Sequence, residues 1–245
     1  MYNFYAVIIG TEILNARRED KHFIFLRDLL KSYGHTLYAT FIIKDEIQLI
    51  AETFKLIKND PNAVLFSFGG IGSTPDDLTR QIAADVFTCK PLVRNKKFEN
   101  DIIERFKEEA YPYRIHMADL PQNANLIFNP INNMSAFELE HRYFFVPGFP
   151  EMSHPMIEEC VKKYFSKALK KYRRTLYAHT SENTLISLMQ QLPQDMELSS
   201  LPVIGANGPK VELSLSSENE NILTIEFKKF TDFLEQKEIL YKLLN

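Results

Sequence analysis

The chain has 245 residues, of which 45% are hydrophobic and 25% are charged, a composition that excludes a largely disordered protein. Its formal net charge is -3, from 29 basic and 32 acidic side chains. This balance provides no cationic field to attract a polyanion, so nucleic acid is not expected as a partner.

Cysteine usage and the N-terminal residues bear on the compartment. Cys89 and Cys160 lie far apart and match no metal-ligand spacing, which is typical of buried thiols in a reducing environment. The apolar run at residues 4–9 is too short to span a bilayer and lacks the basic start of a signal peptide. We therefore expect a cytoplasmic protein that does not associate with a membrane.

Up to residue 170, short β-branched or aromatic runs alternate with longer helical patterns, as in a layered α/β domain. Strands or short apolar pieces that suit strands are predicted at residues 5–9, 36–43, 63–68, 126–128 and 143–146. Apolar residues recur at helical spacing over residues 23–30, 47–57, 78–87, 98–110 and 157–165. This alternation predicts an α/β domain over residues 1–170.

Past residue 170 the pattern changes. Strands are predicted at residues 175–179, 211–215 and 223–227, and helices at residues 185–192 and 233–244. A chain of 245 residues is short for two full-sized domains, so one larger and one smaller domain fit best. We predict a small α+β domain over residues 171–245.

The most informative segment follows the predicted strand at residues 63–68 and reads Gly69-Gly70-Ile71-Gly72-Ser73-Thr74-Pro75-Asp76-Asp77. Three glycines within four residues let the backbone approach a ligand closely and direct N–H groups at an anion such as phosphate. Thr74 and Pro75 suit the cap and first position of a following helix, whose positive end adds affinity for an anion. The spacing matches neither a Walker loop nor a dinucleotide-binding fingerprint.

Two carboxylates end this loop. Asp76 and Asp77 would repel a bare phosphate, so their presence there indicates an intervening divalent cation such as Mg²⁺. The alternative is structural, because Asp77 can close back on Thr74 as a capping box at the start of a helix. The two roles are compatible, and the spacing leaves both open.

Ligands of α/β sheets bind beyond the carboxyl ends of the strands, so loops after other strands are expected to share the site. After the first strand, Gly10 and Thr11 precede Glu12, which is a candidate base or metal ligand. A polar run at residues 17–22 follows, and Asp20 within it is a further candidate metal ligand. The candidates for phosphate contact in this run are Arg17, Arg18 and Lys21. The alternative is that the run is a solvated helix start.

A third loop follows the predicted strand at residues 143–146. It reads Val146-Pro147-Gly148-Phe149-Pro150, a rigid turn in which Phe149 can pack on a flat ring system. The alternative is a plain connection from strand to helix. No Gly-x-Ser-x-Gly motif and no Cys/His arrangement indicates covalent catalysis.

Three segments together resemble the molybdopterin-binding (MoaB/Mog) domain family, in its competence/damage-inducible protein A-like branch. They are Gly10-Thr11-Glu12-Ile13-Leu14, residues 69–79 and Pro147-Gly148-Phe149-Pro150-Glu151-Met152, in the family's order and approximate spacing. The resemblance implies a three-layer α/β/α domain with a mostly parallel sheet, and a nucleotide or a pterin such as molybdopterin as the ligand. It also implies a divalent metal, Mg²⁺ or similar, and a homodimer or homotrimer.

Carried over by motif, Asp77 matches the family's metal-linked aspartate and Asp20 its second acid, while Gly69, Gly70 and Gly72 match the phosphate cradle. With the loop residues above, the candidate metal ligands are Asp77, Asp20 and Asp76, and the candidate catalytic residues are Asp77, Glu12 and Asp20. The candidate binding residues are Gly69, Gly70, Gly72, Ser73, Thr74, Gly10, Thr11, Arg17, Lys21, Pro147, Gly148 and Phe149.

We therefore expect a metal-dependent hydrolase that splits a nucleotide diphosphate such as ADP-ribose or FAD, the activity that the resemblance to the competence-type branch implies. The alternatives are adenylyl transfer to molybdopterin with Mg-ATP, and a module that binds such a ligand without catalysis. Two departures from the family bear on this choice, because Thr11 replaces the usual aspartate and Ser135-Ala136-Phe137 replaces Pro-Gly-Phe. Longer relatives continue into an amidase-type domain, whose activity is expected to be absent from this chain.

Overall fold

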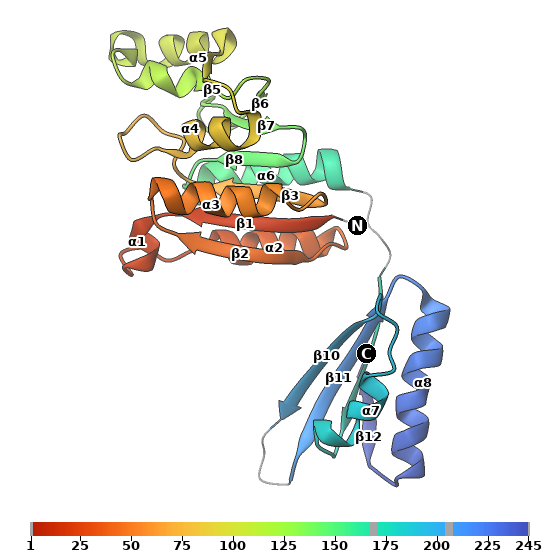
Figure 1. Cartoon of the computed structure of the whole chain (residues 1–245). Helices are drawn as coiled ribbons and strands as arrows, with labels where there is room; N and C mark the ends of the chain where they lie inside the picture. The colour runs from red at the N-terminus through yellow and green to blue at the C-terminus, as the bar shows by residue number, and fades with distance from the viewer. Residues whose placement is uncertain (1, 167–170, 204–207, 245) are drawn as a thin grey trace. The chain divides into compact units, whose positions relative to one another are not determined.

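The computed structural model describes residues 2–166, 171–203 and 208–244 (Figure 1). The chain forms two compact units, Met1–Ala168 and Leu169–Asn245. Each unit has a hydrophobic core of its own, made only of residues from that unit. Within the described residues, no helix combines the length and the hydropathy that crossing a membrane requires.

The first unit is built on a six-stranded sheet in the order β2-β1-β3-β8-β7-β6. The strands are β1 (Asn3–Ile9), β2 (Leu37–Ile43), β3 (Ala63–Phe68), β6 (Asn125–Ile127), β7 (Ala136–Leu139) and β8 (Tyr143–Val146). The first four strands in that order run parallel, β7 runs antiparallel to β8, and the edge strand β6 pairs antiparallel with β7. The predicted mostly parallel sheet is confirmed. Strand β7 is not predicted from the sequence because its four residues include the charged Glu138 and no β-branched residue, unlike the aromatic run of β8.

Helices cover both faces of this sheet, which confirms the predicted three layers (Figure 1). On one face α2 (His22–Ser32) packs against α6 (Pro150–Phe165), and on the other α3 (Ile47–Lys58) packs against α4 (Thr79–Ala83). Every third or fourth residue of α2 and α3 is buried, as the helical spacing predicts. Between the layers the rings of Phe66 and Phe144 stack with centroids 5.2 Å apart.

Smaller elements complete the first unit. They are α1 (Thr11–Leu14), η1 (Ala84–Thr88), β4 (Val93–Arg94), α5 (Lys96–Phe106), η2 (Lys107–Ala110), η3 (Arg114–Ala118) and β5 (Asp119–Leu120). The predicted helix at residues 78–87 is therefore divided, because α4 continues as the π-helical η1. The side chain of Asn95 caps α5 by accepting a hydrogen bond from the Phe98 amide at 3.1 Å.

The second unit is a small antiparallel sheet in the order β10-β11-β9-β12. Its elements are β9 (Tyr172–Ala178), η4 (Glu182–Thr184), α7 (Ile186–Met189), β10 (Glu197–Val203), β11 (Lys210–Ser217), α8 (Glu220–Gln236) and β12 (Tyr241–Leu244). Helix α8 packs its buried residues against β9 and β11. This arrangement confirms the predicted α+β class of the smaller part.

Two predicted elements of this unit are wrong. The strand predicted at residues 223–227 lies inside α8, and the helix predicted at residues 233–244 ends at Gln236, before β12. The buried residues of α8 recur at helical spacing across both segments, so the two predictions divided one helix. The missed signal was Asn219, whose side chain caps α8 by accepting from two backbone amides.

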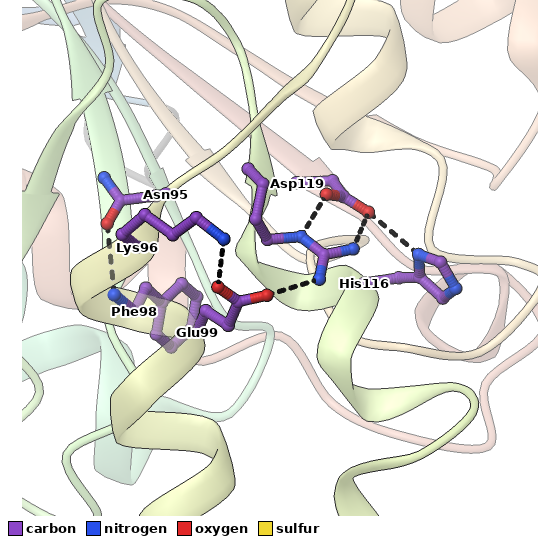
Figure 2. Close-up of polar contacts among 7 residues, drawn as sticks. Asn95, Lys96, Phe98, Glu99, His116 and Asp119 are labelled. Carbon is purple, nitrogen blue, oxygen red and sulfur yellow. Dashed lines mark hydrogen bonds and ion pairs between the residues drawn. The ribbon is translucent and has the colours of Figure 1, made fainter.

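An ion-pair network holds α5 to the short ribbon of β4 and β5 (Figure 2). The Arg94 guanidinium donates from Nε to Asp119 Oδ1 at 2.5 Å and from Nη1 to Glu99 Oε1 at 3.0 Å. His116 Nδ1 lies 2.8 Å from Asp119 Oδ2, and Lys96 Nζ lies 2.8 Å from Glu99 Oε2. Although burial alone would raise it, the pKa of Asp119 is lowered by the hydrogen bonds from Arg94 and His116. The network therefore orders the helix that carries Phe98 and Phe106, two residues of the site described below.

Replacing Asp119 tests this network. We expect Asp119→Asn to lower the free energy of unfolding by about 1–3 kcal/mol, because it removes the charge that the partly buried Arg94 guanidinium and the exposed His116 ring both contact. Lys96→Ala is the matched control, since Lys96 contacts the same network but is 81% exposed and should cost less than about 0.5 kcal/mol. Urea unfolding of both variants measures the difference, and equal losses would contradict the interpretation.

Candidate functional site

A pocket of about 510 Å³ opens where β1, β3 and β8 end, and it is lined by the loops that follow these strands. One part of its lining is polar and consists of the glycine-rich loop with several acidic side chains. The other part is apolar and is formed by Phe98, Phe106, Met117, Met134, Phe149 and Met152. A ligand with a charged end and a flat apolar end would match this division.

The glycine-rich loop takes a backbone path that only glycine permits at two positions. Gly69 and Gly70 have φ values of 103° and 70°, in the left-handed region. A Cβ on Gly69 would meet the carbonyl oxygen of Ile9, and one on Gly70 would meet the Thr79 hydroxyl. The Gly69 amide donates to the carbonyl of Val146 at 2.9 Å. The loop therefore passes between the ends of β1 and β8 with no room for a side chain.

A buried arginine holds the same loop. Arg80, on α4, is 8% exposed and donates from Nη1 to the carbonyl oxygens of Ile71 and Gly72, the latter at 2.5 Å. Its Nε has no hydrogen-bond partner among the described residues. Burial lowers the pKa of this guanidinium, and the nearby charges of Asp77 and Asp119 oppose that effect. A positive charge is thereby fixed against the loop that is the candidate phosphate cradle.

The end of the loop is a closed turn. Asp77 Oδ2 accepts hydrogen bonds from the Thr74 amide at 2.8 Å and from the Thr74 hydroxyl at 2.6 Å. The predicted closure of Asp77 on Thr74 is therefore present. The prediction that Thr74 caps the following helix, with Pro75 at its first position, is wrong because α4 begins only at Thr79.

Four carboxylate side chains, of Glu12, Asp45, Asp76 and Asp77, line the pocket. Asp45 was missed by sequence reasoning, although it follows the carboxyl end of β2 and the strand-end rule could have found it. Its Oδ2 accepts hydrogen bonds from the amide and the hydroxyl of Thr11, both at 2.8 Å. Thr11, which stands where relatives are expected to carry an aspartate, thus holds a carboxylate supplied by another strand.

The polar run at residues 17–22 is divided by the structure. Arg18 lines the pocket, with its Nη1 3.9 Å from Glu12 Oε1 and its guanidinium carbon 5.5 Å from the centre of the Phe149 ring. Asp20 does not line it, because its carboxylate accepts from the amides of His22 at 2.9 Å and Phe23 at 3.1 Å. In the structure, Asp20 therefore binds the first free amides of α2 and does not contribute its carboxylate to the pocket.

The remaining predicted binding residues divide in the same way. Those that line the pocket are Gly69, Gly70, Gly72, Ser73, Thr74, Pro147, Gly148 and Phe149. Those that do not are Gly10, Thr11, Arg17 and Lys21. Across the described part of the chain, no group of three or more His, Cys, Asp or Glu residues is placed to hold a metal ion by itself.

A buried histidine, His22, and a half-buried one, His154, lie next to each other beside the Gly148 turn. His22 Nε2 lies 3.3 Å from the Gly148 carbonyl oxygen, and its Nδ1 lies 3.3 Å from His154 Nε2. The His154 ring stacks on Phe25 with centroids 3.7 Å apart. Burial lowers the pKa of both histidines, to about 4 for His154, where the neighbouring His22 adds to the effect. Both rings are therefore neutral near pH 7.

The lowered pKa of His154 predicts a loss of stability in acid. The unfolded chain takes up a proton near pH 6.5 and the folded chain only near pH 4, so stability falls as the pH drops through this window. We expect the free energy of unfolding to fall by about 1 kcal/mol between pH 7 and pH 4.5. This figure is smaller than the full pKa shift would give, because solvent screens a partly exposed group. Urea unfolding across this range measures it.

Two variants separate this titration from the general acid sensitivity of the protein. His154→Phe keeps a ring for the stack on Phe25 and is expected to reduce the slope of stability against pH. The exposed His179 is the matched control, and His179→Gln should leave the slope of the wild type. An unchanged slope in His154→Phe would rule out the titration of this histidine as the cause.

The comparisons with known proteins agree on one family for this chain. A model of the family described as a probable molybdopterin binding domain matches residues 5–167. A CinA-like protein of Nostoc punctiforme is 29% identical over 160 residues, which cover 62% of this chain and 38% of the relative. A putative competence-damage inducible protein of Halothermothrix orenii is 26% identical over 231 residues, 91% of this chain and 55% of the relative. The chain thus spans about half the length, or less, of these curated relatives.

The first unit also matches a solved structure. The crystal structure of the protein CinA, of unknown function, from Thermoplasma acidophilum aligns with a TM-score of 0.60 at 22% identity. The alignment covers 66% of this chain and 98% of that one. At this identity the match shows a shared fold and carries no activity from one protein to the other.

Proposed function

The chain belongs to the molybdopterin-binding domain family, and we propose that it is a metal-dependent pyrophosphatase acting on nucleotide diphosphates such as ADP-ribose or FAD. One observation carries the proposal. The glycine-rich loop and four carboxylates line the same pocket as an apolar wall of phenylalanine and methionine side chains. An anionic ligand would be repelled by this acidic corner unless a cation stood between them.

The donor atoms of the corner suit a hard cation such as Mg²⁺. Asp45 and Asp77 each use Oδ2 for the hydrogen bonds to a threonine, and Oδ1 accepts none from the described residues. Mg²⁺ is usually held by one or two carboxylates and completes its shell with water and phosphate oxygens. A cation held in this way would need only one or two of these carboxylates and would be shared with the substrate. When bound, it would neutralise charge on the phosphates that are split.

The protein's own groups would act on either side of the scissile bond. Amides of the glycine-rich loop and the Arg18 guanidinium would hold the pyrophosphate, and the apolar wall would hold the flat base. Glu12 would take a proton from water as the water oxygen bonds to phosphorus. The bond from that phosphorus to the bridging oxygen breaks, and the released phosphate keeps that oxygen. ADP-ribose and water would give AMP and ribose 5-phosphate.

Turnover of defined substrates tests this proposal. ADP-ribose and FAD, each with Mg²⁺ or Mn²⁺, should be hydrolysed, and removal of the metal by a chelator should abolish the reaction. We expect Asp77→Asn and Asp45→Asn to lower kcat/KM at least about 100-fold, because each removes a charged cation ligand. Asp20→Asn is the control and should change it less than about threefold, since the asparagine amide oxygen can still accept at the start of α2.

The rival functions give different results in the same assays. Retention of molybdopterin and its adenylation with Mg-ATP would favour the transferase reaction. Tight binding of ADP-ribose in calorimetry without turnover would favour a non-catalytic module. Equal activity of wild type and Asp77→Asn would reject the hydrolase.

Thr11 offers a separate test of the acidic corner. Thr11→Val keeps the backbone amide but removes the hydroxyl that donates to Asp45, so this carboxylate should be less well fixed. We expect the Mg²⁺ concentration for half-maximal activity to rise about tenfold, as for other residues that orient a metal ligand. Thr88→Val removes a hydroxyl bonded to the Ala84 carbonyl, away from the pocket lining, and should leave that concentration unchanged. Equal effects of the two variants would contradict this role for Thr11.

A further inference from the structure

We propose that His22 is a positioning residue of the pocket, whose Nε2–H fixes the Gly148 carbonyl and through it the turn that carries Phe149. The inference rests on the proposed function for its ligand-binding test and on the geometry alone for the rest. His22 lies outside the pocket lining and takes no direct part in binding. Its contact with Gly148 joins residues that are 126 positions apart in the chain.

His22 is fixed on several sides. Asp20 Oδ1 accepts from the His22 amide at 2.9 Å, and the imidazole stacks on Phe68 with centroids 4.4 Å apart. Its Nδ1 faces His154 Nε2 at 3.3 Å. The residue is 3% exposed, so water does not compete for the ring. Because a carbonyl oxygen only accepts hydrogen bonds, the proton must lie on His22 Nε2.

Gly148 is the point at which this contact can affect the pocket. A Cβ on Gly148 would lie 3.4 Å from the Gly69 Cα, so the two loops are in close contact here. Phe149 follows at once, is 49% exposed, and lines the pocket beside Arg18. A displacement of the Gly148 peptide would therefore change the position of the Phe149 ring and the space next to the glycine-rich loop.

The chain contains a matched histidine that serves as the control. His35 Nε2 lies 2.8 Å from the Phe165 carbonyl oxygen, at the far end of α6, and its ring lies 4.9 Å from that of Phe4. It is thus a second histidine that donates to a backbone carbonyl and contacts an aromatic ring. His35 does not line the pocket, so its loss should affect stability without affecting the Phe149 turn.

The experiment compares His22→Leu, His22→Gln and His35→Leu in the full chain. Hydrogen exchange of the Met152 and Ser153 amides reports on the turn, because both donate to the Phe149 carbonyl. Calorimetry with Mg²⁺ and a methylene-bridged analogue of ADP-ribose, which has no bridging oxygen to split and is not hydrolysed, reports on ADP-ribose binding in the pocket. We expect His22→Leu to speed this exchange and to weaken ADP-ribose binding, each about tenfold, the effect of one lost hydrogen bond.

The other two variants decide whether His22 acts by positioning the turn that carries Phe149. Glutamine places a donor at the same number of bonds from Cα, so His22→Gln should restore both values to within about threefold of the wild type. His35→Leu should leave both unchanged. The proposal is overturned if His22→Leu leaves both values unchanged, or if His35→Leu shifts them equally. If the wild type binds no ADP-ribose, the proposed function fails, and amide exchange alone decides the role of His22.

Discussion

The close approach of three loops at the carboxyl ends of β1, β3 and β8 is the constraint on which the site depends. Gly69 donates its amide to the Val146 carbonyl and leaves no space for a Cβ beside the carbonyl of Ile9. Gly148, on the loop after β8, lies against the same residue. Parallel strands bring their carboxyl ends to one edge, so segments far apart in the sequence must meet there. A substitution that shifts the backbone of one of these loops is therefore expected to displace the other two.

The same edge also concentrates charge. Acidic side chains from the loops after β1, β2 and β3 line one part of the pocket. Arg80 lies buried against the glycine-rich loop near Asp77, and Arg18 Nη1 lies 3.9 Å from Glu12 Oε1, so both arginines oppose some of this negative charge. Thr11 carries no carboxylate of its own. Its amide and hydroxyl donate to Asp45, and these two hydrogen bonds hold the Asp45 carboxylate beside it. The order of the strands in the sheet thus determines which acidic side chains line the same pocket.

The sequence predicted most of the first unit, because β1, β3 and β8 are mostly apolar and α2 and α3 bury every third or fourth residue. It failed where a signal was short or depended on a cap. Strand β7 is four residues long and includes the charged Glu138, and α8 begins at a cap, Asn219, that the apolar spacing does not reveal. The glycine-rich loop was placed correctly from its composition alone. The start of the following helix was not, since Asp77 closes on Thr74 in a turn and α4 begins only at Thr79.

Asp20 and Asp45 show why a candidate site is harder to predict than a fold. Each stands beside a glutamate in a polar stretch after a β-strand, and the neighbouring residues alone do not distinguish a ligand from a structural residue. Asp20 is two residues from the first turn of α2, and the free amides there bind its carboxylate. Asp45 follows β2 directly and meets Thr11 across the parallel pairing of β1 and β2. Backbone amides at the start of α2 therefore occupy the Asp20 carboxylate, whereas the pairing of β1 with β2 brings the Asp45 carboxylate to the pocket.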